Sequence, residues 1–259
     1  MTTQDTTEDA RRVSRNLDAV VVRLSDSVTI IHGDCRDVLP VECDAVVTDP
    51  PYGMDYPCNF AGRGRGNLAA CNDWPNVAGD AEPFDPAWIL AMGKPTVLWG
   101  ANWYADKLPP QSGWLVWDKE RPDDLDQATC ELAWTNCVKG VRRFRHLWNG
   151  MMKASEKGES YHPTQKPVAL FAWTLALRWL ADVETVFDPY MGAGPCGVAC
   201  VRAGKRYVGV EINQAHFATA RQRLENELRQ GLLPLTHNAP REAGAVAPSL
   251  HADVGREVE

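Results

Sequence analysis

Hydrophobic residues occur along most of the chain in short, nearly uninterrupted runs that polar turns separate. Runs of four or five residues that are rich in valine, isoleucine, threonine and aromatic side chains predict β-strands. Because their apolar residues are continuous rather than alternating, we expect strands that are covered on both faces, as in a parallel sheet. The predicted strands span residues 27–31, 45–48, 96–99, 114–117, 183–187 and 206–210.

Helical patterns lie between or after some of these strands. Residues 168–181 are apolar almost all round, which predicts a buried helix, and residues 195–204 also have helical character. Residues 214–229 place their apolar side chains on one stripe with charges opposite, which predicts an amphipathic helix. Strands that alternate with helices predict an α/β chain with a doubly wound sheet and helices on both faces.

Polar segments at both ends frame one predicted domain. Residues 1–20 are polar, and residues 235–259 are rich in alanine, proline, glycine and charge, so we expect flexible tails. Residues 21–234 are long and apolar enough for one core. The longest nearly uncharged run, 168–177, is about half of the roughly 20 residues that a membrane span needs, and the N-terminus has no signal-peptide core. We therefore expect a cytoplasmic protein without a membrane partner.

The distribution of charge changes what the net charge suggests. The chain carries a net charge of −7, which argues against binding to nucleic-acid phosphates. Between Lys139 and Lys157, however, six lysines or arginines stand against one acid, with aromatic side chains among them. This composition suits a DNA-facing loop, and a solvated basic face is the alternative. The eight cysteines include no CxxC pair, so we expect reduced, mostly buried thiols and no metal site.

The tetrapeptide Asp49-Pro50-Pro51-Tyr52 follows a predicted buried strand and therefore lies at the carboxyl edge of the sheet, where α/β proteins bind ligands. Its prolines lack N–H donors, which leaves carbonyls that only accept hydrogen bonds beside an acidic side chain. Tyr52 adds a flat aromatic face. Together these residues suit a planar amine such as adenine or cytosine, and an ordinary Pro-Pro turn is the alternative.

A second motif, VFDPYMGAG over residues 186–194, follows another predicted strand. Its glycines let the backbone approach a ligand, and Glu211, at the end of the next strand, suits ribose hydroxyls. These features are typical of a nucleoside-type cofactor site, although a tight turn also needs small residues. Residues 192–197 match GxGxxG as well, which leaves a nicotinamide-dependent dehydrogenase open. That fingerprint normally begins a fold, whereas here it stands near the end.

A third motif, HPTQKP over residues 162–167, precedes the apolar helix predicted from residue 168. Proline in a first turn favours helix initiation, and free N–H groups together with Lys166 would form an anion site. A cofactor carboxylate suits such a site. A helix-initiating loop with a solvated lysine is the alternative.

The motifs together resemble those of one family, the beta-class amino-methyltransferases of DNA. These enzymes use S-adenosyl-L-methionine to methylate adenine N6 or cytosine N4. The resemblance covers about residues 27–230, and further runs are similar to the solitary enzymes of phages and prophages. The motifs, in the order of the family, are IHGD at 31–34, DPPY at 49–52, HPTQKP at 162–167, DPYMGAG at 188–194 and GVEI at 209–212.

The resemblance implies a mostly parallel sheet of the seven-stranded methyltransferase type, with the motifs in circularly permuted order. Tyr190 stands where the family commonly has phenylalanine, and Pro195-Cys196 replace hydroxyl residues, which would weaken cofactor binding. Neither departure removes the glycines or the acid. The cofactor-binding residues that the resemblance implies are Asp34, Thr164, Lys166, Asp188, Gly192, Gly194 and Glu211.

The resemblance also implies how the chemistry proceeds. A base flipped out of the duplex would donate its amino hydrogens to Asp49 and to the Pro50 carbonyl while it stacks on Tyr52, and Pro51 completes the catalytic motif. Aspartate at the head of the motif favours adenine N6, because the cytosine-N4 enzymes more often carry serine there. Cytosine N4 is the alternative, and a methyltransferase of the same fold that acts on RNA or a protein amide is a more distant one.

Two loop regions, residues 53–86 and 118–160, are expected to recognise double-stranded DNA, and the first to close over the flipped base. Because one catalytic domain nearly fills the chain, we expect a short recognition site. The sequence leaves open the site itself, a homodimer, and a restriction endonuclease partner. The expected DNA contacts are Arg63, Arg65, Lys139, Arg142, Arg143 and Arg145.

Overall fold

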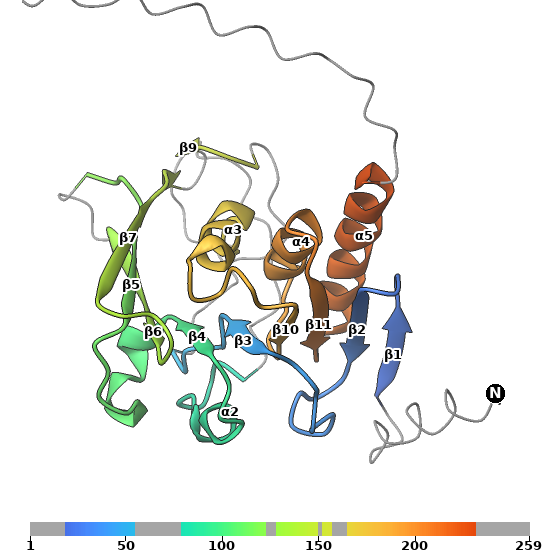
Figure 1. The fold of residues 1–259 in the computed structure, drawn as a ribbon, viewed down its shortest axis with the longest axis horizontal. Coiled ribbons are helices and arrows are strands. Elements are labelled where there is room, and N and C mark those ends of the chain that lie inside the picture. The colour runs from blue at the N-terminus through green and yellow to red at the C-terminus, as the bar shows by residue number, and fades with distance from the viewer. Residues whose placement is uncertain (1–18, 55–78, 123–127, 150–151, 157–164, 232–259) are drawn as a thin grey trace, which may run out of the picture.

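A nine-stranded sheet organises the protein in the computed structural model (Figure 1). Its strand order is β1-β2-β11-β10-β3-β4-β6-β5-β7, and a separate two-stranded ribbon pairs β8 with β9. No helix in the described part of the chain is both long and apolar enough to cross a membrane. The structure describes residues 19–54, 79–122, 128–149, 152–156 and 165–231, so nearly all of both predicted tails and most of the predicted loop 53–86 lie outside the described residues.

All six predicted strands are present within two residues of their expected bounds. The sequence patterns missed β1 and β7, whose side chains are mostly exposed, and β6, which begins with exposed and half-buried residues. These strands lack the continuous apolar run of a strand covered on both faces. The strands are β1 (Val20–Arg23), β2 (Val28–His32), β3 (Ala45–Thr48), β4 (Thr96–Trp99), β5 (Trp114–Asp118), β6 (Cys130–Thr135), β7 (Val141–Arg145), β8 (Trp148–Asn149), β9 (Met152–Lys153), β10 (Thr185–Asp188) and β11 (Arg206–Glu211).

The centre of the sheet is parallel. Strands β2, β11, β10, β3 and β4 run in one direction. Strand β1 pairs antiparallel with β2, β6 pairs antiparallel with both β4 and β5, and β7 runs parallel to β5. The α/β class and the mostly parallel sheet are therefore confirmed, with nine strands where seven were expected. The late strands β10 and β11 insert between the early strands β2 and β3, which is the arrangement that the permuted motif order implies.

Helices α3, α4 and α5 cover one face of the sheet, and α2 lies on the other face (Figure 1). Two 3-10 helices and the segment 33–44 complete the α2 side. The helix predicted over 168–181 ends early, because the backbone of Leu177 is extended. The helices are α2 (Ala87–Ala91), η1 (Ala101–Trp103), η2 (Ala105–Lys107), α3 (Val168–Ala176), α4 (Pro195–Arg202) and α5 (Gln214–Gly231).

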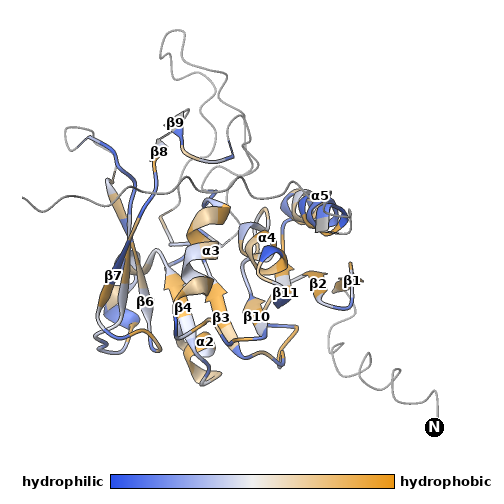
Figure 2. Cartoon of the chain, turned by 45° about the horizontal axis from the view of Figure 1, so that its top comes forward, coloured by the Kyte–Doolittle hydropathy of each residue, from blue (hydrophilic) through white to orange (hydrophobic). Residues whose placement is uncertain are grey.

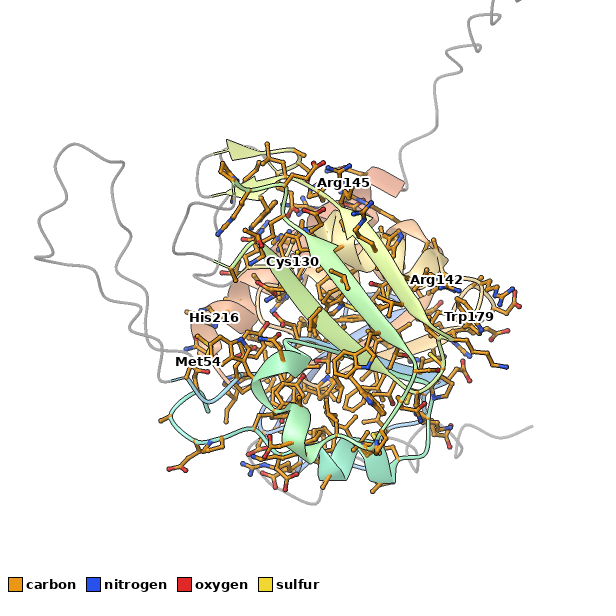
Figure 3. The ribbon with its side chains drawn as sticks, turned by 90° about the vertical axis from the view of Figure 1, so that its left-hand side faces the viewer. Met54, Cys130, Arg142, Arg145, Trp179 and His216 are labelled. Carbon is orange, nitrogen blue, oxygen red and sulfur yellow. The ribbon has the colours of Figure 1, made fainter. Side chains whose placement is uncertain are left out.

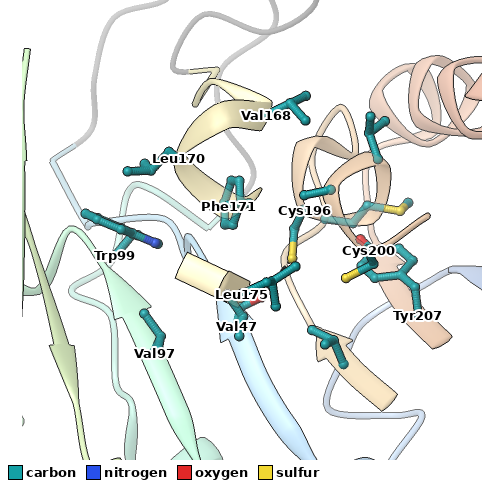
Figure 4. Packing of buried hydrophobic residues seen from close by; sticks show 14 of the residues in the cluster. Val47, Val97, Trp99, Val168, Leu170, Phe171, Leu175, Cys196, Cys200 and Tyr207 are labelled. Atoms are coloured by element: carbon teal, nitrogen blue, oxygen red, sulfur yellow. Dashed lines mark hydrogen bonds between the residues drawn. The ribbon is translucent and has the colours of Figure 1, made fainter. Parts of the chain in front are cut away.

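The main core lies between the sheet and the α3–α5 layer, as the close-up in Figure 4 shows. Phe171 and Leu175 of α3 pack over Val47 and Trp99 of the central strands, and all four side chains are buried. Each such side chain contributes about 1.5–3 kcal/mol through burial. Figure 2 shows the hydrophobic central strands beneath helices whose outer positions are more hydrophilic. The buried central strands hold their carboxyl ends in a rigid row, from which the loops of the site begin.

Candidate active site

One cavity of about 1210 Å³ lies at the carboxyl ends of the central strands. It is lined both by the motif that follows β3 and by the motif that follows β10, which are more than 130 residues apart in the sequence. The adjacency arises because β3 and β10 pair in parallel, so both strands end at the same edge. The predicted site residues that line this cavity are Asp34, Asp49, Pro50, Pro51, Tyr52, Lys166, Asp188, Gly192 and Glu211.

The Asp49 carboxylate lines this cavity, and both of its oxygens accept hydrogen bonds. The Tyr52 hydroxyl donates a hydrogen bond to Oδ1 at 2.5 Å, and the Lys166 ammonium donates one to Oδ2 at 2.9 Å. The same ammonium donates to Tyr52 Oη at 2.7 Å. Burial raises the pKa of Asp49, and the nearby positive charge of Lys166 opposes the rise.

Lys166 also forms an ion pair with Glu131 of β6, at 3.1 Å between Nζ and Oε2. Lys119, just after β5, donates to the other oxygen of Glu131 at 2.5 Å. Burial alone would raise the pKa of Glu131, but the two lysines lower it below its usual value. Burial likewise opposes the charge of Lys166, and its two carboxylate partners still raise the pKa of the ammonium. The pairing of Lys166 with the two carboxylates thus favours the charged forms of Lys166 and Glu131.

Sequence reasoning missed both Lys119 and Glu131. The available signal was Glu131 itself, a charged side chain near the start of an otherwise mostly apolar run at 130–134. A buried charge requires a partner, but the partner lies on a neighbouring strand and is not visible in the sequence order.

Tyr52 is held by its backbone and by its ring. The N–H groups of Tyr52, Gly53 and Met54 all donate to Asp80 Oδ1, at 3.0, 3.0 and 3.3 Å. The ring of Trp103 lies nearly parallel to the Tyr52 ring, with an interplanar angle of 11° and 6.5 Å between centroids. Neither Asp80 nor Trp103 was predicted, because only the folded backbone brings them next to the motif.

The opposite part of the cavity is built by the loop after β10. Glu211 at the end of β11 accepts hydrogen bonds from the N–H groups of Gly192, at 2.9 Å, and Asn213, at 2.7 Å. Gly192 has φ +53°, and no atom lies within 4 Å of the position a Cβ would take. The backbone is thus open to close approach there. Asp34 is held by Arg36, whose guanidinium lowers the pKa of the carboxyl.

One predicted cofactor contact, Gly194, and the predicted anion site at the start of α3 differ from the expectation. Gly194 does not line the cavity, and it caps α4 with φ +75° against Ala220 of α5. The helix start at Val168 is not a free anion site either, because its N–H donates to Glu156 Oε2 at 2.9 Å. Arg223 pairs with the same carboxylate at 2.9 Å. Thr164 lies outside the described residues.

The predicted DNA-contacting residues that are described lie away from the cavity. Figure 3 shows Arg142 and Trp179 on the opposite side from Met54 and His216, two residues of the cavity lining. Arg142 stacks over Trp179 at 5.3 Å, and Arg145 pairs with two carboxylates. Of the predicted basic residues, Lys139, Arg142, Arg143 and Arg145 do not line the cavity, and Arg63 and Arg65 lie outside the described residues.

A comparison with protein families matches residues 81–222, more than half of the chain, to the N6/N4 family that is described as DNA methylase. The chain belongs to this DNA methylase family. The methyltransferase resemblance is therefore confirmed, and the substrate class of this DNA methylase is DNA.

Named relatives and solved structures are similar to this DNA methylase over most of their length. It is 24% identical over 247 residues to Type II methyltransferase M2.DpnII of Streptococcus pneumoniae. This alignment covers 78% of this chain and 91% of the relative. It is 23% identical over 252 residues to Type II methyltransferase M2.LlaDCHI of Lactococcus lactis subsp. cremoris, which covers 80% and 93%.

Among solved structures, the M1.HpyAVI complex with SAM is 21% identical, with a TM-score of 0.47, over 76% of this chain and all of that chain. The PvuII DNA methyltransferase, described as cytosine-N4-specific, is 12% identical with a TM-score of 0.49, over 80% and 93%.

Buried Asp188 predicts a pH-dependent stability. It accepts hydrogen bonds from Thr48 at 2.7 Å and Tyr207 at 3.0 Å, and burial raises its pKa to about 7. The folded state retains the proton on Asp188, whereas the unfolded chain releases it near pH 4. The stability that the protonated carboxyl contributes is therefore complete below pH ~4 and is lost as the pH rises to ~7. Asp188→Asn mimics the protonated carboxyl. We expect the variant to gain on the order of 2–3 kcal/mol relative to wild type between pH 5 and pH 8.

Urea unfolding of both proteins at the two pH values measures this difference. Parallel pH profiles of the free energy of unfolding would show that Asp188 is ionised in the folded state throughout this range.

The close contact between Gly100 and the Tyr52 ring predicts a second effect. A Cβ on Gly100 would lie 1.9 Å from Tyr52 Cε1, so Gly100→Ala must displace the ring. Gly93→Ala is a matched control, because Gly93 has a similar φ of +64° and no atom within 4 Å of its Cβ position. Both variants should lose about 1–2 kcal/mol through left-handed strain. Only Gly100→Ala should reduce methyl transfer, by roughly 10²-fold, since ring and carboxylate move together.

Transfer assays on the folded variants, checked by thermal unfolding, measure this effect. An equal loss of activity in Gly93→Ala and Gly100→Ala would disprove the role of the contact.

Proposed function

We propose that this DNA methylase transfers a methyl group from S-adenosyl-L-methionine to the exocyclic N6 of an adenine flipped out of double-stranded DNA. The observation that carries the proposal is the placement of Asp49 beside the Gly192 loop and Glu211 in one cavity. The proposed acceptor of the amine and the proposed site for a nucleoside-type cofactor therefore share one cavity.

The residues present fit the cofactor. Glu211 is a carboxylate whose oxygens have further acceptor capacity beyond the two backbone N–H groups they hold, which suits ribose hydroxyls. The open backbone at Gly192 allows close approach, and the cavity of about 1210 Å³ has room for a cofactor and a base together. When bound, S-adenosyl-L-methionine supplies an electrophilic methyl group. Asp34 is proposed to lie near its adenine.

Asp49 and the Pro50 carbonyl would hold the target amine. An exocyclic amine is a weak nucleophile, because its lone pair is delocalised into the ring. Two acceptors that bind its two hydrogens let the nitrogen become pyramidal and direct the lone pair at the methyl carbon. The nitrogen–carbon bond then forms as the carbon–sulfur bond breaks, and the nitrogen releases one proton to water. The chain contributes mainly orientation.

The rings of Tyr52 and Trp103 would hold the plane of the base. They are nearly parallel, with 6.5 Å between their centroids, and both line the cavity. A flipped base that stacks on such a platform gains affinity independent of sequence, since every base has an aromatic face. Aspartate at position 49 favours adenine, and cytosine N4 is the second candidate.

The basic segment of the predicted loop 118–160 is proposed to face the DNA backbone. Arg121 and Lys153 line the same cavity as Asp49, whereas the arginines of β7 do not. Lys139, Arg142, Arg143 and Arg145 are proposed to contact more distant phosphates, together with Arg63 and Arg65. Such an enzyme works where DNA is accessible, in the cytoplasm of a bacterial host or of a phage-infected cell.

Methylome sequencing of DNA treated with the purified chain and S-adenosyl-L-methionine tests the proposal. N6-methyladenine at one short recognised site is the expected result. N4-methylcytosine would select the second candidate, and the absence of any modified base would overturn the proposal.

Asp49→Ala is expected to reduce transfer by about 10²–10³-fold or more, because one of the two acceptors of the amine is lost. Cofactor affinity, measured by calorimetry, should change little, since Glu211 and Gly192 are untouched. Lys166 keeps its ion pair with Glu131, so the variant should fold. Asp182→Ala on an exposed turn is the matched control and should transfer methyl groups like the wild type. Near-normal transfer by Asp49→Ala would remove Asp49 from the mechanism.

A further inference from the structure

The carboxylate of Asp49, the proposed acceptor of the amine, already accepts hydrogen bonds from other side chains of the chain. Asp49 accepts hydrogen bonds from Tyr52 at 2.5 Å and from Lys166 at 2.9 Å, one at each oxygen. An incoming amine needs at least one of these oxygens. An amine that approaches Asp49 therefore competes with Lys166 and Tyr52 for the lone pairs of these oxygens.

Lys166 cannot simply be released into water. Its side chain is 4% exposed, so an ammonium that loses Asp49 has no solvent to compensate its charge. An unpaired buried charge is strongly unfavourable. A second carboxylate within reach is therefore required if Asp49 is to exchange Lys166 for the substrate amine.

Glu131 meets this requirement. Its Oε2 atom is buried without a hydrogen-bond partner among the described residues, and it lies 3.1 Å from Lys166 Nζ. Its Oε1 atom is held by Lys119 at 2.5 Å, which fixes the orientation of the carboxylate. Lys119 is itself held over the ring of Trp117, 5.1 Å from the centroid. A second anionic partner for Lys166 is therefore already within reach.

We propose that Glu131 is a positioning residue that retains the Lys166 ammonium while Asp49 binds the amine of the base. This inference rests on the proposed function, since it assigns Asp49 as the acceptor of that amine. A small rotation of the ammonium exchanges a hydrogen bond to Asp49 for one to Glu131. The charges of the two lysines stay balanced by the two carboxylates. The neutral amine of the base replaces only the hydrogen bond from Lys166 to Asp49, so the exchange itself adds or removes no charge.

Several charged or titratable groups face Asp49, and they set the sign of a pH test. Lys166 favours the ionised carboxylate, whereas the negative charge of Glu131 raises the pKa of Asp49. Removing that charge should lower the pH at which Asp49 becomes protonated and activity is lost. The groups that surround Asp49 are Lys166, Glu131, Tyr52, Tyr104 and Asp188.

Glu131→Gln in the full-length chain tests the proposal by steady-state transfer to DNA that carries the recognised site. We expect kcat to fall about 10²-fold, with KM for S-adenosyl-L-methionine and for DNA within about threefold of wild type. The acid limb of the kcat profile should move to lower pH. Glu184→Gln, an exposed glutamate paired with Arg206, is the matched control and should leave all three quantities unchanged.

A double variant separates positioning from structural damage. Glu131→Gln alone leaves Lys119 without its carboxylate, and Glu131→Gln with Lys119→Met restores the charge balance. Lys166 then has only Asp49 as an anionic partner, so kcat should stay low although the fold is restored. Recovery of wild-type kcat in the double variant would overturn the proposal, as would an unshifted acid limb in Glu131→Gln.

A measurement without catalysis distinguishes this inference from the proposed function. In spectra of 15N-labelled lysine side chains, the slowly exchanging Lys166 ammonium, assigned by Lys166→Met, should persist in Asp49→Asn, because Glu131 retains it. It should disappear in Asp49→Asn combined with Glu131→Gln. Loss of the signal in Asp49→Asn alone overturns the inference even if the wild type methylates DNA. A wild type that methylates no DNA overturns the proposed function, whatever these spectra show.

Discussion

The parallel pairing of β3 with β10 is the constraint on which the rest of the site depends. Val186 lies opposite Ala45 and Phe187 opposite Val46, so both strands end at one level of the sheet. Thr48 then donates a hydrogen bond to buried Asp188, which ties the two strand ends together. The loops that leave these ends are the acceptor motif and the glycine loop. A shift of this pairing would separate the proposed base site from the proposed cofactor site.

Buried charges give the acceptor site its second property. Asp49, Lys166, Glu131 and Lys119 come from four separate parts of the chain, and their opposite charges balance each other along the wall of one cavity. Such networks stabilise little by themselves, because desolvation offsets much of the attraction between the charges. Their value lies in fixed geometry. Lys166 lies within reach of two carboxylates, at 2.9 Å from Asp49 and 3.1 Å from Glu131, so it keeps an anionic partner if one of them binds another group.

Local patterns predicted much of the fold and the two halves of the site. The central strands were found because each is a continuous apolar run, and the motifs after 48 and 188 were found because Pro-Pro and Gly-x-Gly restrict or free the backbone. Edge strand β7, with three arginines, was missed, since its exposed side chains carry no burial signal. The prediction of a free anion site at Val168 was wrong, because the N–H of Val168 already donates to Glu156, which lies outside the motif.

The sequence by itself determined the class of fold, the order of the motifs and the residue types that can hold an amine and a nucleoside. These properties are local, because they depend on backbone freedom and on short runs or stripes of apolar residues. Only the tertiary structure decided that Lys166 binds Asp49, that Glu131 stands 3.1 Å from the same ammonium and that Trp103 lies parallel to Tyr52. Contacts between distant segments arise from strand pairing and helix packing, which no short motif encodes.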